Sequence, residues 1–321
     1  MLYDAILVDS ANLFYRLKKQ STTALEVIKK MINYMDNEVF SHIKNDGTVY
    51  ILFDPISYTD LGESKSFYHP LNERKVILSD YKSNRKHSNI YLETIELFRK
   101  YYLHRGEKVK LAYSDSHEAD DYVEPLLELY KDKTVALISN DHDFAGYISK
   151  DVHMINESFD KPFTVEEFEK LYEFKPTVAA NIVYKSFFGD KSDNITGAIF
   201  IKKAKFNVNV KVMCRDYILS VVEKNMTIDE VINQFKTANF KDINDKETKD
   251  TFDTLYLTLS IVDLRAPVLD TFLRNVQVIR SSLSGKSIDK YLHFNPVNEC
   301  LNDIIQKSIY GIPFKQVFGR V

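Results

Sequence analysis

AILVDS, at residues 5–10, is an unbroken apolar run that ends in an acidic and a small polar residue. Comparable runs occur in VYILFD (49–54), VKLAYS (109–114), TVALIS (134–139) and VHMIN (152–156). Continuous apolar character, in place of alternation between apolar and polar residues, is typical of strands buried on both faces of a parallel sheet. These five runs therefore predict a central, mostly parallel sheet.

Helical patterns separate the predicted strands. They cover residues 24–45, 89–105 and 118–131, and this alternation of strand and helix predicts an α/β fold with helices on both faces of the sheet. Beyond about residue 160 the strand signals fade and helical patterns dominate. We therefore expect an α/β core at residues 1–160 and a helical region at residues 161–321.

The composition excludes several classes of protein. The chain has 321 residues, 44% of them hydrophobic and 28% charged, which is an ordinary globular balance. Its net charge of −3 argues against a strongly basic nucleic-acid binder, so any such role would depend on local basic patches. Cys214 and Cys300 form neither a metal-binding spacing nor a disulfide framework, and no apolar run is long enough to span a membrane. These features predict a soluble, cytoplasmic protein with no membrane partner.

Carboxylates follow the predicted strands at the points where those strands end. In parallel sheets ligands bind outside the carboxyl ends of the strands, which favours convergence of these side chains. Each acid taken alone also fits a helix N-cap or a turn, but separate structural causes would then have to coincide. Nine carboxylates belong to this set: Asp9, Asp54, Glu118, Asp120, Asp121, Asp141, Asp143, Asp190 and Asp193.

A convergent set of carboxylates requires a cation. A cluster of oxygen ligands without paired histidine or cysteine selects a hard cation, either Mg²⁺ or Mn²⁺. The number of acids favours two ions a few ångströms apart, an arrangement that clamps the attacking and leaving oxygens in phosphoryl transfer. The sequence has no glycine-rich phosphate loop, so hydrolysis of a phosphodiester is the natural inference.

Residues 56–88 form a long polar, basic and aromatic connection, here called the arch segment. Connections of this length are usually functional or disordered. An aromatic ring among cations can stack a base while the cations hold phosphates; the alternative is a solvated basic loop. The candidate residues are Arg74, Lys75, Tyr81, Lys82, Arg85 and Lys86. A second basic stretch, at 201–215, could bind the duplex backbone or be an ordinary amphipathic helix surface.

The order and spacing of these motifs resemble those of a known family. VDSANLFYR, FDP, DYKSNRK, HEADDYV, SNDHDF and GDKSDNITG are similar to motifs of the 5′ nucleases of the flap endonuclease superfamily. The resemblance is strongest to bacteriophage enzymes and to the 5′–3′ exonuclease domain of bacterial DNA polymerase I. It covers about the first two-thirds of the chain and implies a PIN-like 5′ nuclease core.

The resemblance implies roles for individual residues. The ligands of a first metal ion would be Asp9, Asp54, Glu118 and Asp120. The direct or water-mediated ligands of a second ion would be Asp121, Asp141, Asp143, Asp190 and Asp193. Within the arch segment Lys82 and Arg85 would stabilise the scissile phosphate, and Tyr81 would contact DNA. Asn12 and Arg16 match the tail of the first motif.

Two departures from the family pattern concern glycine. Ser10 stands where the family usually has glycine after the first aspartate. GDKSDNITGAIFIKKAK lacks the Gly-Ile-Gly hairpin of the family's helix–hairpin–helix element, so residues 185–215 form at most a degenerate version of it. Without those glycines the backbone site for a K⁺ ion is not favoured. Duplex contact would rest on Lys202, Lys203 and Lys205.

We therefore expect a stand-alone Mg²⁺-dependent 5′–3′ exonuclease or flap endonuclease, with Mn²⁺ as a substitute ion. Its substrates would be DNA with a 5′ flap, nick or 5′ end, and RNA primers paired to DNA, in replication or repair. We expect a monomer that works with replication proteins such as a clamp or a single-strand binding protein, encoded by a phage. The alternatives are a catalytically weak structure-specific DNA-binding protein and a PIN-like ribonuclease.

Overall fold

The structure is a computed structural model. It describes residues 1–54, 88–103, 108–113, 118–172, 174–191, 193–196 and 210–224, with the short segments 226–227, 230–231 and 233–234. Several predictions therefore lie outside the described residues: the arch segment apart from its last residue, the helical patterns expected beyond residue 234, and the side chains of Arg74, Lys75, Tyr81, Lys82, Arg85, Lys86, Lys202, Lys203 and Lys205. The division at residue 160 stays a prediction.

A six-stranded sheet with the order β3-β2-β1-β4-β5-β6 forms the centre of the fold. Its strands are β1 (Tyr3–Asp9), β2 (Ile43–Leu52), β3 (Val109–Ala112), β4 (Val135–Ile138), β5 (Val152–Ser158) and β6 (Lys161–Phe163). The first five are parallel, and β6 pairs with β5 in the antiparallel sense. The predicted mostly parallel sheet is confirmed, and its carboxyl ends bring the segments after β1, β2 and β4 to one edge.

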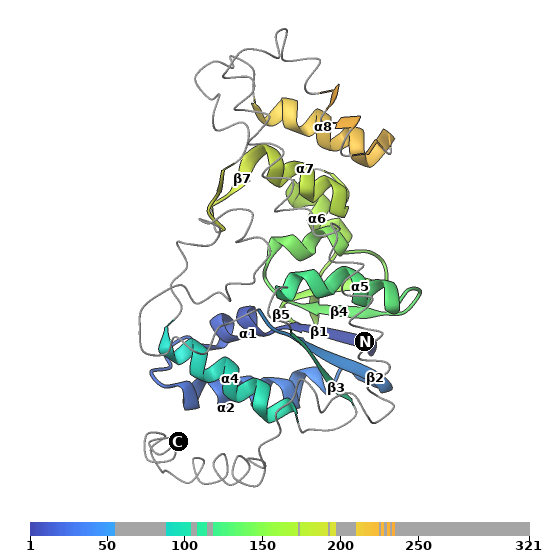
Figure 1. The fold of residues 1–321 in the computed structure, drawn as a ribbon. Coiled ribbons are helices and arrows are strands. Elements are labelled where there is room, and N and C mark those ends of the chain that lie inside the picture. Colours follow the sequence, from blue (N-terminus) through green and yellow to red (C-terminus); the bar gives the residue numbers. More distant parts are fainter. Residues whose placement is uncertain are drawn as a thin grey trace, which may run out of the picture.

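Helices cover both faces of this sheet (Figure 1). One face packs against α1 (Ser10–Leu17), α2 (Ala24–Tyr34) and α4 (Asn89–Leu103). The opposite face packs against α5 (Val123–Leu129) and α6 (Val165–Tyr172). Consecutive residues of β1 point to opposite faces, and every position of the strand except Asp4 is buried. This two-sided burial is the reason for the continuous apolar runs in the sequence.

The helix predicted at residues 24–45 is too long. In the structure α2 ends at Tyr34, a π-helical turn η1 (Met35–Val39) follows, and β2 already begins at Ile43. Pairing with β1 overrides the local helical pattern, as tertiary contacts often do. A Cβ atom at Gly47 would lie 3.0 Å from the backbone oxygen of Asp4, so glycine permits this close strand pairing.

The segment HEADDYV does not open a continuous helix. A 3-10 turn, η2 (Ala119–Tyr122), comes first, and α5 begins at Val123. Pro125 therefore lies in the first turn of α5, where its missing N–H costs nothing. Of the two alternatives that this proline suggests, a kink or a late start, the structure has the late start.

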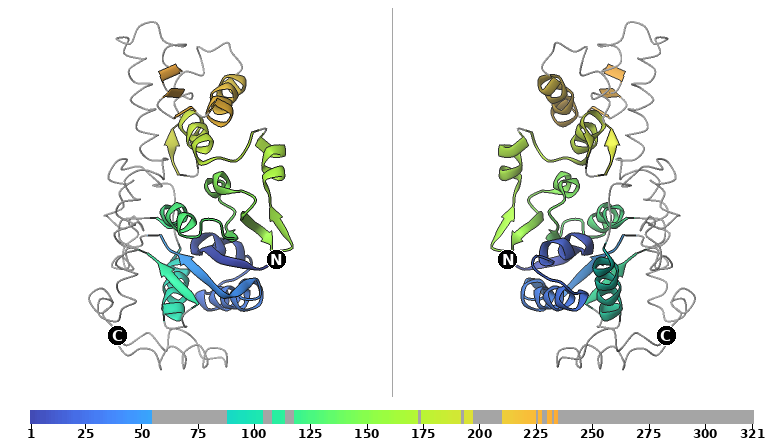
Figure 2. Two further views of the ribbon diagram at one scale, coloured as in Figure 1. Left: turned by 90° about the vertical axis from the view of Figure 1, so that its right-hand side faces the viewer. Right: turned by 90° about the vertical axis from the view of Figure 1, so that its left-hand side faces the viewer.

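Beyond α6 the chain forms a second group of elements farther from the sheet (Figure 2). These are α7 (Val178–Phe188), a short hairpin of β7 (Gly189–Asp190) and β8 (Ile195–Thr196), and α8 (Val210–Lys224). The strands of this hairpin are too short for an apolar run, and the sequence analysis did not predict them. None of the helices in the described ranges is long and apolar enough to cross a membrane.

Candidate metal centre

Asp9 lies at the carboxyl end of β1 and is only 8% exposed. It is the N-cap of α1, and its Oδ1 accepts a hydrogen bond from the backbone N–H of Asn12 at 3.0 Å. Its Oδ2 accepts a second hydrogen bond from the Ser139 hydroxyl at 3.1 Å. The strand end and the start of the helix together hold this carboxylate in one orientation.

Ser139 connects Asp9 to the end of β4. While its Oγ donates to Asp9, the same atom accepts the backbone N–H of Asp141 at 3.0 Å. Asp141 then caps the 3-10 turn η3 (His142–Tyr147) by accepting the N–H of Asp143 at 3.0 Å. Ser139 was not predicted as a site residue, since a serine after a buried strand is too common to be a signal by itself.

The charge on Asp9 is poorly compensated within the described part of the chain. Burial raises its pKa to about 7, and repulsion from Asp54 and Asp141 contributes, against the opposing effects of the Asn12 and Ser139 hydrogen bonds. These cross-strand effects require the three carboxylates to lie near one another. A cation between them would remove the repulsion and favour their ionised forms.

Asp54 joins β2 to the segment that starts at Glu118. Its Oδ1 accepts the backbone N–H of Ala119 at 3.0 Å, which docks η2 against the end of β2. Glu118, 1% exposed, donates its own N–H to Asp121 Oδ2 at 2.8 Å, and Asp121 is 5% exposed. This places two buried carboxylates beside the strand ends, with the half-buried Asp120 between them.

A second group of acids forms around the β7–β8 hairpin. Asp143, Asp190 and Asp193 each offer a carboxylate oxygen, and these oxygens all lie within 4.8 Å of one another. Gly189, at φ 74°, and Asn194, at φ 59°, turn the backbone so that Asp190 and Asp193 return to the same place. The turn-forming character of FFGDKSDN is thus what brings its acids together.

Lys185 is the second residue that the sequence analysis missed. It lies on α7, and its Nζ is 2.7 Å from Asp190 Oδ2 and also pairs with Asp143 Oδ1. Burial alone lowers the pKa of Lys185, but the attraction of Asp143, Asp190 and Asp141 outweighs burial and raises that pKa well above its ordinary value. The ammonium group is therefore charged at any physiological pH.

The nine predicted carboxylates, here called the acidic centre, thus lie in two connected groups. Asp143 belongs to the second group, and the charges of Asp141 and Asp120 in the first group repel its carboxylate, so the two groups are close enough to interact. The donors are carboxylate oxygens, several of them buried, which suits hard divalent ions. Capping uses one lone pair of an oxygen that has two, so the N-cap interpretation of Asp9 and Asp141 and the ligand interpretation are compatible. Their role as metal ligands stays a prediction.

Arg16 turns toward the protein. Its guanidinium donates to the backbone oxygens of Glu157 and, at 3.5 Å, of Ile155, and it lies 4.9 Å from the ring centroid of Tyr34. These contacts tie α1 to β5 across the end of the sheet. The DNA-binding role predicted for Arg16 stays a prediction, and the structure adds this structural role.

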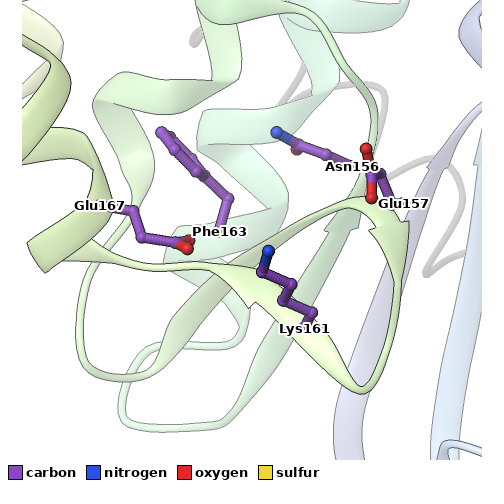
Figure 3. A pocket seen from close by; sticks show the side chains of 5 residues that line it. All are labelled: Asn156, Glu157, Lys161, Phe163 and Glu167. Atoms are coloured by element: carbon purple, nitrogen blue, oxygen red, sulfur yellow. The ribbon is translucent and has the colours of Figure 1, made fainter.

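A small pocket of about 170 Å³ lies between the β5–β6 hairpin and α6 (Figure 3). Its lining residues are Asn156, Glu157, Lys161, Phe163 and Glu167. No member of the acidic centre lines it. The acidic centre is therefore separate from this pocket.

The architecture is a PIN-like 5′ nuclease fold, and solved structures of 5′ nucleases share it. The bacteriophage T5 flap endonuclease, in a pseudo-enzyme–product complex with DNA and metal ions, matches with a TM-score of 0.54 and 18% identity, over 94% of this chain and 99% of that one. T5 5′-exonuclease with bound zinc matches with a TM-score of 0.56 and 19% identity, over 85% and 98%. No protein-family model and no curated protein matches the sequence.

Proposed function

We propose that this chain is a metal-dependent 5′ nuclease that hydrolyses phosphodiester bonds in DNA bearing a 5′ flap, a nick or a 5′ end. The observation that carries the proposal is the acidic centre: carboxylates at the end of β1, after β2, and in η2, η3 and the β7–β8 hairpin form two neighbouring groups that are linked through Asp141 and Asp143. The shared fold with a T5 flap endonuclease solved with DNA and metal ions supports it.

Two divalent ions, Mg²⁺ with Mn²⁺ as a substitute, fit the donor set. The first would be held by Asp9, Asp54, Glu118 and Asp120. The second would be held, directly or through water, by Asp121, Asp141, Asp143, Asp190 and Asp193. When bound, such a pair supplies charge stabilisation to the attacking and leaving oxygens of an in-line displacement.

The protein's own contribution is orientation. Backbone N–H groups of Asn12, Ala119 and Asp143 each hold one carboxylate, and Ser139 holds two segments in register. Carboxylates fixed in this way need no rearrangement when the reaction develops charge. Closely spaced acids of this kind titrate as a group, so we assign them as ligands and not as a general-base pair.

Substrate contacts would come from basic residues. In the arch segment Lys82 and Arg85 would face the scissile phosphate. The neighbouring DNA would be bound by Arg74, Lys75, Tyr81 and Lys86. The duplex backbone would be held by Lys202, Lys203 and Lys205, since lysine side chains bind phosphates electrostatically and independently of the base sequence. RNA primers paired to DNA, a role in replication or repair and a clamp or single-strand binding protein as partner belong to the same proposal.

One gel tests the proposal. A 5′-flap duplex, a nicked duplex and an RNA–DNA hybrid are each incubated with the protein in Mg²⁺ and in EDTA. We expect cleavage near the flap junction in Mg²⁺ only, and loss of at least about 100-fold in rate for Asp141→Asn, whose amide still caps η3. Near wild-type cleavage by Asp141→Asn would refute the ligand assignment.

Other outcomes point to the alternatives. Binding of flap DNA without cleavage of any substrate would indicate a catalytically silent structure-specific DNA-binding protein. Cleavage of RNA alone, with no action on flap or nicked DNA, would indicate a PIN-like ribonuclease. Lys82→Ala should slow cleavage more than it weakens DNA binding, and unchanged turnover would remove the arch role.

A further inference from the structure

Lys185 occupies the middle of the second acidic group. Its Nζ contacts Asp190 Oδ2 at 2.7 Å and Asp143 Oδ1, and its side chain is only 12% exposed. The same two aspartates, with Asp193, are the acids whose oxygens lie within 4.8 Å of one another. A lysine ammonium and a divalent ion would therefore use the same oxygens.

Members of the acidic centre differ in this respect. Within the described residues, no lysine or arginine forms an ion pair with Asp9 or Asp141, whereas Asp143 and Asp190 share the ammonium of Lys185. Asp143 and Asp190 therefore already have a positive partner inside the protein. Because Lys185 is largely shielded from solvent, salt screens its attraction to Asp143 and Asp190 only weakly.

The backbone around Lys185 is held in place, so only its side chain could leave. Asn181, one turn earlier on α7, donates to the backbone oxygen of Asp143 at 3.4 Å. Gly146 of η3 approaches the start of α7 so closely that a Cβ atom there would lie 3.1 Å from Val178 Cα. A lysine side chain has four rotatable carbons and can carry its ammonium away without moving the helix.

We propose that Lys185 is an internal counterion that stands in for the second divalent ion, and that an ion binding between Asp143, Asp190 and Asp193 displaces its ammonium group. This inference deepens the proposed function and rests on it. The metal-free protein can then fold with three clustered acids without a bound ion. The cost is competition: the second ion binds more weakly than it would without Lys185, because it must replace a cation that is already paired.

Titration calorimetry with Mn²⁺, on the full chain without DNA, tests this competition. The wild type should bind two ions. Lys185→Met, which keeps the length and apolar stem of the side chain, should bind the second ion about 5- to 150-fold more tightly, the usual range for coupling between two binding events. The affinity for the first ion should not change.

Two further variants serve as controls. Lys185→Arg keeps the positive charge, so its second ion should remain as weak as in the wild type. Lys170→Met removes an exposed lysine from the last turn of α6 and should leave both affinities unchanged. If Lys185→Met is folded by circular dichroism and its second ion binds no more tightly than in the wild type, the competition does not exist.

A measurement on the wild type avoids dependence on the folding of the variant. An amine-reactive reagent is applied with and without Mg²⁺, and labelling is read by mass spectrometry. Labelling of Lys185 should increase when Mg²⁺ is added, while Lys170 should label equally in both conditions. Unchanged labelling of Lys185 at saturating Mg²⁺ would overturn the displacement.

The same experiments separate the two proposals. If the wild type binds no divalent ion and cleaves no substrate, the proposed nuclease function is lost and the role of Lys185 with it. If the wild type binds two ions and cleaves flap DNA in Mg²⁺ while Lys185→Met leaves metal binding unchanged, only the counterion role is lost.

Discussion

Ser139 and Asp9, which are 130 residues apart in the sequence, are joined by a buried hydrogen bond of 3.1 Å between the ends of two adjacent parallel strands. The same hydroxyl accepts the N–H of Asp141. One serine therefore sets the relative position of two predicted metal ligands. Groups that orient ligands in this way are often as important for a metal site as the ligands.

Ser139→Ala should lower the rate of Mg²⁺-dependent cleavage by about 10- to 100-fold, the usual effect of removing a group that orients a ligand. The fold should persist, because alanine fits where a serine is already buried. Single-turnover cleavage of a flap substrate measures the rate, and circular dichroism checks the fold. Ser41→Ala, at an exposed serine, is the matched control. Equal rates for both variants would mean that Ser139 does not orient the centre.

The stability of the metal-free protein should depend on the protonation of Asp9. The folded-state pKa of this carboxyl is raised to about 7, above the ordinary value of about 3.9. Such a group binds more protons in the folded than in the unfolded state between these values. Its contribution to stability is therefore complete below about pH 4 and is lost as the pH rises toward about 7, by at most about 1.4 kcal/mol per pH unit.

Urea unfolding in EDTA at several pH values measures this effect, with Asp9→Asn as the non-titrating control. The free energy of unfolding of the wild type relative to the variant should fall between about pH 4 and pH 7. Addition of Mg²⁺ should remove or reverse the trend, because the ion binds the ionised carboxylate. A difference that does not vary with pH would show that Asp9 titrates alike in the folded and unfolded chains.

Gly146→Ala should destabilise the protein. An alanine Cβ would lie 3.1 Å from Val178 Cα and 3.2 Å from the backbone oxygen of Thr177, and backbone atoms cannot yield as a flexible side chain can. The substitution would push α7 away from η3, at a cost of about 1–3 kcal/mol. Urea unfolding gives this loss, and cleavage should fall further than stability predicts, since α7 leads directly into the β7–β8 hairpin that carries Asp190 and Asp193. An unchanged midpoint would show that the two segments can separate freely.

Arg16→Lys should also destabilise the protein. An arginine fork can serve the backbone oxygens of Ile155 and Glu157 together, whereas a lysine offers one point charge. We expect a loss of about 1 kcal/mol in unfolding free energy. Binding of flap DNA in Ca²⁺, measured well below the melting temperature, addresses the predicted DNA-binding role separately. Weakened DNA binding with unchanged stability would favour that role over the structural one.

Much of the fold was predictable because its strands carry local signals. The runs that begin at Ala5, Val49, Val109, Val135 and Val152 are mostly apolar, and each forms a strand of the sheet. The end of the helix at Tyr34 was not predictable in this way. There the pairing of Ile43 with Tyr3 decides the structure, and that partner lies 40 residues earlier in the chain.

The sequence by itself determined the parallel sheet and the presence of acids at its strand ends, because burial on two faces and capping leave marks on neighbouring residues. Only the tertiary structure revealed what lies between those acids. Ser139 reaches Asp9 from another strand, and Lys185 reaches Asp143 from a helix 42 residues later, through contacts that no local pattern records. Such contacts depend on how the folded elements meet, and they decide which carboxylates already have a positive partner.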